Sequence, residues 1–243
     1  MKILSHVWPS NAQKSLIKRH QFSRKLSGLL VTFLTIGLLA SATTVQANGN
    51  TMPSNTMVIV GDSLSSEYGI RRNTGWVQLL RDKMADSIAN PPTVINASIS
   101  GDTTSSGLTR LPALLKEYQP AIVLIELGGN DALRGLSLDM TRDNLTEMIT
   151  LSQAAGAKVI LAGMQIPPNY GPAYTKQFRD LFPEVAQQTN SQLVPFLLAG
   201  LELDRSLFIE DGIHPAEHAQ PILLENVWAV LEPALAEWQA QKE

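Results

Sequence analysis

The sequence predicts an open α/β sheet of about five parallel strands covered by helices. Short runs rich in Val, Ile and Leu alternate with longer amphipathic segments over most of the chain. Each short run is almost continuously apolar, as expected for strands that are buried on both faces of a parallel sheet. The alternation of strand and helix patterns favours βαβ units, and these units build such sheets.

The elements are expected in strict alternation along the chain. Apolar runs predict strands, and apolar residues at helical spacing predict the helices between and after them. Gly156 is typical of a residue that ends a helix just before the next strand. The expected strands are TMVIVG (56–61), PTVINAS (92–98), AIVLIEL (121–127), KVILAG (158–163) and QLVPF (192–196), and the expected helices are 75–89, 107–118, 141–156, 173–189 and 219–239.

Residues 1–47 differ in composition from the rest and are expected to be a signal peptide. They hold six of the 19 basic residues and none of the 22 acidic ones. An uncharged run over 28–40 is followed by Val45 and Ala47 at the −3 and −1 positions of a small-residue cleavage site. The run is shorter than the ~20 residues that span a bilayer, although an uncleaved anchor is the alternative.

Cleavage after Ala47 would leave a mobile lead-in over 48–55 and one domain over 56–243, in the periplasm or outside the cell. With six basic residues removed, 13 remain against 22 acidic ones. An acidic domain is a poor candidate for nonspecific binding to nucleic acid or anionic lipid. The absence of cysteine excludes disulfides, thiol nucleophiles and thiolate metal sites. Nothing in the sequence requires more than a monomer.

Four polar clusters that contain glycine follow predicted strands, where α/β sheets bind their ligands. Each cluster alone is explained by turn and cap residues. Together, however, they supply different parts of one catalytic site. The clusters are GDS (61–63), ISGDTT (99–104), GGND (128–131) and DGIHP (211–215).

Ser63 provides a hydroxyl at the end of the first strand, and it needs a base. His214 and His218 are the two histidines after residue 47, and Asp211 lies three residues before His214. At this spacing the carboxylate can orient the imidazole within one turn, as in a serine triad. Asp62 is more simply interpreted as a turn residue that accepts backbone N–H groups.

Acyl transfer also needs hydrogen-bond donors for an oxyanion. The backbone N–H groups of Ser63 and Gly101 and the side-chain amide of Asn130 are the candidates. Asp131 is interpreted as a helix cap. The order Ser, Asp, His is that of the α/β-hydrolases, but their G-x-S-x-G elbow is absent.

The four clusters resemble the four sequence blocks of the SGNH (GDSL) hydrolase family, in the same order across nearly all of residues 56–243. NASISGDTTSSGLTRLPALLK, ELGGNDALRGL and DGIHPAEHAQP resemble in particular a bacterial periplasmic subfamily of thioesterases and lysophospholipases. The resemblance implies a three-layer α/β/α, flavodoxin-like fold. It also implies that Ser63 is the nucleophile, that Gly101 and Asn130 donate to the oxyanion, and that Asp211 and His214 complete the triad.

The resemblance further implies hydrolysis of small aryl and alkyl esters, acyl thioesters or lysophospholipids without a cofactor or metal. In that subfamily the loop that corresponds to 132–137 is mobile and helps to form the acyl pocket. Leu133 and Leu136 suit this role, and Tyr170 in the 167–174 loop is a candidate substrate wall. Simple loop packing is the alternative for all three side chains.

Three other functions stay open on the sequence. The first is a metal-dependent hydrolase that uses Asp211, His214 and His218, although no further ligand lies nearby. The second is a lipid-binding module without catalysis, which the complete set of catalytic parts argues against. The third is a carbohydrate deacetylase on the same fold, which the leucines of the 132–137 loop disfavour. The sequence leaves open the physiological substrate and its acyl length.

Overall fold

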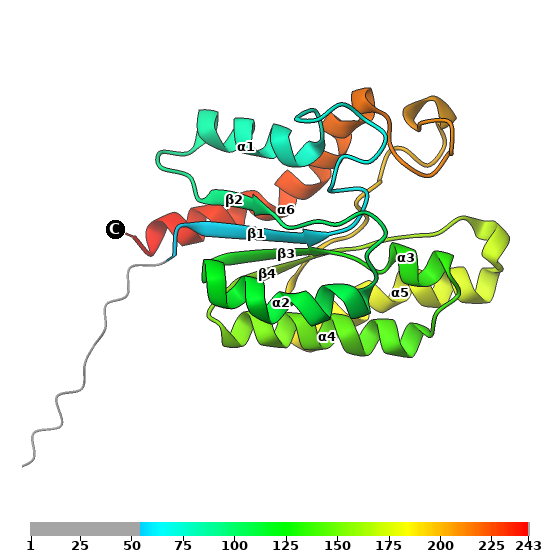
Figure 1. Cartoon of the computed structure of the whole chain (residues 1–243), viewed down its shortest axis with the longest axis horizontal. Coiled ribbons are helices and arrows are strands. Elements are labelled where there is room, and N and C mark those ends of the chain that lie inside the picture. The colour runs from blue at the N-terminus through cyan, green and yellow to red at the C-terminus, as the bar shows by residue number, and fades with distance from the viewer. Residues whose placement is uncertain (1–53, 243) are drawn as a thin grey trace, which may run out of the picture. The chain divides into compact units, whose positions relative to one another are not determined.

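The structure is a computed structural model that describes residues 54–242. The predicted signal peptide over 1–47 and most of the predicted lead-in lie outside these residues. The described part of the chain forms a central sheet with helices on both faces (Figure 1). None of the helices within 54–242 has the length and apolar character that crossing a membrane would require.

The central sheet confirms the predicted fold class. All five strands are parallel, and their spatial order is β2-β1-β3-β4-β5. This is the flavodoxin-like order, in which the chain changes direction across the sheet between β1 and β3. The strands are β1 (Thr56–Gly61), β2 (Thr93–Asn96), β3 (Ile122–Glu126), β4 (Lys158–Ala162) and β5 (Gln192–Val194).

The helices form the two outer layers. On one face α1 (Trp76–Ser87) packs beside α6 (Gln220–Ala240) (Figure 1). On the other face α4 (Leu138–Ala154) packs between α2 (Thr104–Tyr118) and α5 (Pro172–Thr189). The short helix α3 (Gly129–Leu133) follows β3, and 3₁₀ turns lie at η1 (Pro168–Tyr170), η2 (Arg205–Leu207) and η3 (Glu217–Ala219).

The core lies on both faces of the sheet, as the apolar strand runs predict. The side chains of β1 and β3 from residues 57–60 and 122–125 are fully buried. Burying one such aliphatic side chain contributes about 1.5–3 kcal/mol to stability. Glu126, the last residue of β3, is also fully buried and is the exception to this apolar pattern. A charged group in such a place needs an explanation from function or from its partners.

Several element ends differ from the predicted ones for local reasons. Helix α2 begins three residues earlier than expected, because the Thr103 side chain accepts a hydrogen bond from Ser106 N (3.3 Å) and caps it. Strand β5 ends at Val194, because Pro195 has no N–H to continue the ladder. Helix α3 was not predicted, since five residues are too few to show helical periodicity.

Candidate active site

The side chains of Ser63, His214 and Asp211 form one hydrogen-bonded relay at the carboxyl end of the sheet. The distance from Ser63 Oγ to His214 Nε2 is 2.8 Å, and that from His214 Nδ1 to Asp211 Oδ2 is 2.6 Å. Ser63 lies two residues after the end of β1, whereas the other two residues lie in the loop before α6. The topology therefore brings together the three side chains that the sequence predicts for a triad.

The surroundings of Asp211 determine the tautomer of His214. Partial burial acts to raise the pKa of Asp211, but hydrogen bonds from the His214 and Ile213 N–H groups and from the His214 ring outweigh it and lower the pKa. The two backbone bonds, at 3.0 and 2.9 Å, both go to Oδ1. An ionised carboxylate only accepts, so Nδ1 carries the proton and donates to Oδ2. The lone pair on Nε2 then faces the Ser63 hydroxyl.

The predicted oxyanion donors lie on three separate segments of the same rim. Within residues 54–242, neither Ser63 N–H nor Gly101 N–H donates to any protein acceptor. Asn130 Nδ2 donates one hydrogen to Asp62 Oδ2 at 2.9 Å, which leaves its second hydrogen for another acceptor. Gly101 has a φ of +82°, a conformation that favours glycine. The structure thus presents donors of the kind that an oxyanion needs.

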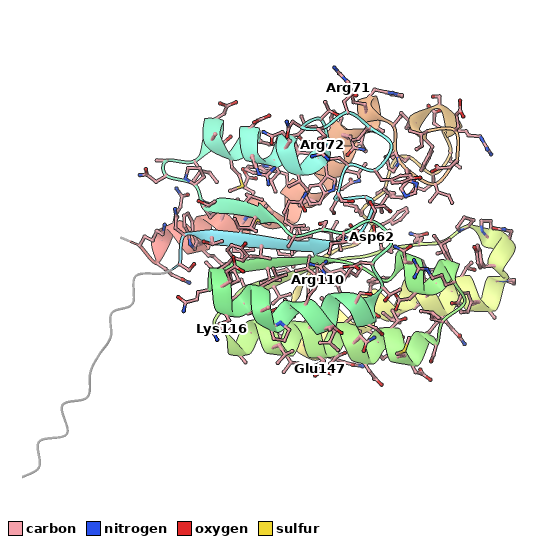
Figure 2. All side chains as sticks on the ribbon, viewed as in Figure 1. Asp62, Arg71, Arg72, Arg110, Lys116 and Glu147 are labelled. Atoms are coloured by element: carbon pink, nitrogen blue, oxygen red, sulfur yellow. The ribbon has the colours of Figure 1, made fainter. Side chains whose placement is uncertain are left out.

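Asp62 does more than the turn role predicted for it. Its Oδ1 accepts from Leu64 N at 3.0 Å, which confirms the turn, and its Oδ2 holds the Asn130 amide. Burial raises the pKa of Asp62 from 3.8 to about 6, against the opposing effects of the Leu64 N–H, the Asn130 amide and the nearby His214. Figure 2 shows Asp62 at the carboxyl end of β1, close to the rim.

Glu126 lies beneath Asp62 and reaches the same turn from β3. Its Oε2 accepts from Ser65 Oγ at 2.7 Å and from Asp62 N at 3.2 Å. Gly61 is the register partner of Glu126 in the sheet. A Cβ atom at Gly61 would come within 2.7 Å of Glu126 Oε2 and 2.8 Å of Ser65 Oγ. Gly61 is therefore needed for space at this point, since its φ is not positive.

Two arginines hold the segment that carries Gly101. Arg110 of α2 donates to the Asp102 carboxylate (2.8 Å) and to the backbone carbonyls of Ala97 and Gly61. Its guanidinium thereby joins the ends of β1 and β2 to the Gly101 turn, and Figure 2 places it between α2 and the sheet. Arg134 donates to Gly101 O at 2.8 Å from the loop after α3.

The candidate substrate residues lie around that loop. Leu133 and Leu136 are half-buried and Tyr170 is exposed. Tyr170 Oη donates to Leu133 O (3.3 Å), and Tyr174 Oη lies within hydrogen-bonding distance of both Ala132 O (3.4 Å) and Leu136 O (3.3 Å). The two tyrosines thus support the backbone of the loop. This fits loop packing for Tyr170, and its part in substrate binding stays a prediction.

Exposed apolar side chains gather near the relay. The Tyr68 ring lies 4.5 Å from the His214 ring between centroids, and 52% of its surface is exposed. Ile213 precedes His214 and is also exposed. On the Gly101 segment, Ile99 is 51% exposed, and its N–H donates to Gly61 O. Exposed apolar surface of this kind beside a nucleophile is typical of a site that receives an apolar group.

Asp131 has a structural role, and the residues of the metal alternative do not form a ligand group. Asp131 is fully buried and accepts from Thr104 N (2.9 Å) and from the Thr104 and Thr141 hydroxyls, so it joins α2, α3 and α4. His218 is exposed on η3. Among the described residues, no three His, Asp or Glu side chains are grouped as metal ligands. Both ring nitrogens of His214 already have partners in the relay.

Sequence reasoning missed three residues that shape the site. Glu126 left a visible signal, since it is the one charged residue in the predicted strand AIVLIEL. Arg110 left none, because its partners lie eight or more residues away. Gln220, buried at the start of α6, donates to Pro215 O (3.2 Å) and accepts from Trp76 N (3.0 Å). It anchors the His214 loop to α1.

Comparisons with known proteins identify the family of this chain. Residues 59–220 match the model of the GDSL-like lipase/acylhydrolase family. The chain is 50% identical to Esterase TesA of Pseudomonas aeruginosa over 182 residues, which are 75% of this chain and 90% of that protein. It is 40% identical to the thioesterase 1/protease 1/lysophospholipase L1 of Escherichia coli over 180 residues, which are 74% and 85% of the two chains.

Solved structures show the same relationship. The crystal structure of TesA is 50% identical and superposes with a TM-score of 0.71, covering 73% of this chain and 98% of that one. The psychrotrophic esterase EstA from Pseudoalteromonas sp., solved in a form inhibited by monoethylphosphonate, is 41% identical with a TM-score of 0.71, covering 75% and 100%. The chain therefore belongs to the GDSL-like lipase/acylhydrolase family, the family of the SGNH hydrolases.

Proposed function

We propose that this chain is an exported serine ester hydrolase that acts through an acyl-enzyme on Ser63. The observation that carries the proposal is the continuous relay from Ser63 Oγ through His214 to Asp211, at 2.8 and 2.6 Å. A hydroxyl becomes a useful nucleophile when an oriented base stands ready to take its proton. Export is inferred from the composition of residues 1–47.

In the first half of the reaction, Ser63 Oγ attacks the carbonyl carbon of the ester while its proton passes to His214 Nε2. The imidazolium that forms is stabilised by the ionised Asp211. The carbonyl oxygen becomes an oxyanion, which Ser63 N–H, Gly101 N–H and Asn130 Nδ2–H are placed to receive. Collapse of this tetrahedral species releases the alcohol or thiol, which takes the proton from His214.

In the second half, His214 Nε2 accepts a proton from water as the water oxygen attacks the acyl carbon on Ser63. The same three donors receive the second oxyanion. Collapse then breaks the bond to Ser63 Oγ, which takes back the proton, and the carboxylic acid leaves. No step needs a group from outside the chain other than water and the substrate.

The proposed substrates are small aryl and alkyl esters, acyl thioesters and lysophospholipids. Relatives named esterase, arylesterase and thioesterase 1/lysophospholipase L1 support this range. The exposed apolar side chains of Tyr68, Ile99 and Ile213 near the relay support an acyl or aryl group as the part that binds. A monomer provides every residue that the mechanism uses.

The test is Ser63→Ala with p-nitrophenyl butyrate as substrate. We expect kcat to fall at least about 1,000-fold, because the nucleophile is lost while the fold is kept. Ser66→Ala is the matched control, since its hydroxyl contacts Ser100 and not the relay. A phosphonate should add its mass to Ser63 in the wild type and not in Ser63→Ala. Full activity in Ser63→Ala would overturn the proposal.

A further inference from the structure

We propose that Glu126 is a positioning residue that holds a proton, donates a hydrogen bond to the Asp62 carboxylate, and so fixes the Asn130 amide for the oxyanion. This inference rests on the proposed function. It concerns a buried carboxyl group that the mechanism above does not use.

The two groups that donate hydrogen bonds to Glu126 are both neutral. Its Oε2 accepts from the Ser65 hydroxyl (2.7 Å) and from Asp62 N (3.2 Å), whereas Oε1 is buried and has no hydrogen-bond partner within residues 54–242. The residue itself has no exposed surface. An ionised carboxylate in such a place would keep its full charge without a cation and with one oxygen unpaired, which is very costly. A carboxylic acid removes the charge and supplies a donor.

The surrounding charges favour the same state. Arg110, the cation that reaches the end of β1, is engaged with Asp102, Ala97 O and Gly61 O. The charged group next to Glu126 is the Asp62 carboxylate. Two carboxylates in contact cannot both ionise without a large cost, so one of them keeps a proton. Burial, then the Asp62 charge and a hydrogen bond between the two side chains, raise the pKa of Glu126 well above its usual value.

Of the two acids, Asp62 is the one arranged to carry the charge. It accepts from Leu64 N and from Asn130 Nδ2, and both of these hydrogen bonds favour its ionised form. Each of its two oxygens has a donor, so a proton on Asp62 would compete with one of these bonds. Glu126 has an oxygen to spare. The proton therefore belongs on Glu126. The hydrogen bond from Glu126 holds the Asp62 carboxylate, and this carboxylate in turn holds the Asn130 amide.

The backbone is built around the Glu126 side chain. Gly61, its register partner, has no side chain, and a Cβ there would come within 2.7 Å of Oε2. The glycine that precedes Asp62 and Ser63 thus makes room for this carboxyl group directly below the turn. Both the space left at Gly61 and the charges around the buried Glu126 side chain indicate that Glu126 supports this turn.

The test compares Glu126→Gln with Glu126→Leu. Glutamine keeps an acceptor for Ser65 and a donor for Asp62, as a protonated Glu does, so kcat on p-nitrophenyl butyrate should stay within about threefold of wild type. Leucine removes both, so the Asn130 amide loses its support. We expect kcat to fall about 100-fold with little change in KM, comparable to the loss of one oxyanion donor. Glu147→Gln, at an exposed site on α4, is the charge control (Figure 2).

Infrared difference spectroscopy reads the proton without any turnover. Wild-type protein at pH 7 should show the C=O stretch of a buried carboxylic acid, which shifts with ¹³C-labelled glutamate and is absent from Glu126→Gln. This measurement holds even when Glu126→Leu does not fold. An ionised Glu126 in the infrared spectrum, or a Glu126→Gln as inactive as Glu126→Leu, would overturn the inference. Failure of the wild type to hydrolyse any ester, with the acid band present, would instead overturn the proposed function alone.

Discussion

Gly61→Ala is expected to destabilise the fold far more than a glycine-to-alanine change at a position with room for a Cβ atom. The new Cβ would lie 2.7 Å from Glu126 Oε2, 2.8 Å from Ser65 Oγ and 2.9 Å from Ser65 Cβ. All of these contacts are too short, and the atoms are buried, so the Ser65 and Glu126 side chains must move apart. Overpacking of this kind costs about 1–3 kcal/mol, and loss of the buried Ser65–Glu126 hydrogen bond adds about 1–3 kcal/mol. We therefore expect a loss of about 2–6 kcal/mol in the free energy of unfolding.

Gly129→Ala is the matched control for that change. Gly129 is buried at the same rim and opens α3, and its φ is not positive. A Cβ there would meet Met164 Cε at 3.6 Å and Asp62 Oδ2 at 3.8 Å, which are ordinary contacts. In a helix, alanine gains up to about 1 kcal/mol over glycine. Urea unfolding of both variants gives the comparison, and equal stabilities would refute the steric role of Gly61.

Three further predictions concern the relay, the buried acids and the loop. Asp211→Asn should lower kcat about 10,000-fold with the fold intact, because the amide favours the wrong His214 tautomer; stopped-flow assays with p-nitrophenyl butyrate check it. The pKa of Asp62 is raised from 3.8 to about 6, so the native state binds more protons than the unfolded state in that window and loses stability as pH rises through it. Asp62→Asn removes this dependence, and its stability relative to wild type should rise by up to about 3 kcal/mol between pH 4 and 7 in urea titrations. Tyr174→Phe removes the hydroxyl near Ala132 O and Leu136 O, so KM for longer acyl esters should rise while kcat for acetate esters stays unchanged.

The sequence was sufficient to predict that Ser63, His214 and Asp211 meet, because a parallel sheet brings the carboxyl ends of its strands to one edge. Ser63 and His214 lie 151 residues apart, yet both follow segments that end at the carboxyl rim of one parallel sheet. The prediction needed no knowledge of side-chain packing. It needed the strand pattern, the rule that ligands bind at this rim, and the small number of histidines. Local capping, such as that of α2 by Thr103, was harder to predict because neighbouring hydroxyl residues offer equivalent caps.

The roles of Glu126 and Arg110, in contrast, could not be predicted from the sequence. Each acts on a segment that is remote in sequence, since Glu126 reaches the turn after β1 and Arg110 reaches the ends of β1 and β2. Their roles depend on strand order and register, and periodicity does not encode these. Glu126 was nevertheless visible as a lone acid in an apolar strand. A lone acid in a buried strand is a candidate for a functional role even before its neighbours in space are known.

These contacts change how the block Gly61-Asp62-Ser63 is understood. The three residues have three separate physical tasks: Gly61 leaves space for the Glu126 carboxyl group, Asp62 holds the Asn130 amide, and Ser63 supplies the hydroxyl. Two of these tasks are directed at β3 and the turn that follows it, so the block joins neighbouring strands as well as carrying the nucleophile. A serine after a strand is common, because turns and caps favour it. The order of glycine, acid and serine is explained by two residues of the neighbouring strand β3 and its following turn. These are Glu126 at the end of β3 and Asn130 four residues beyond it.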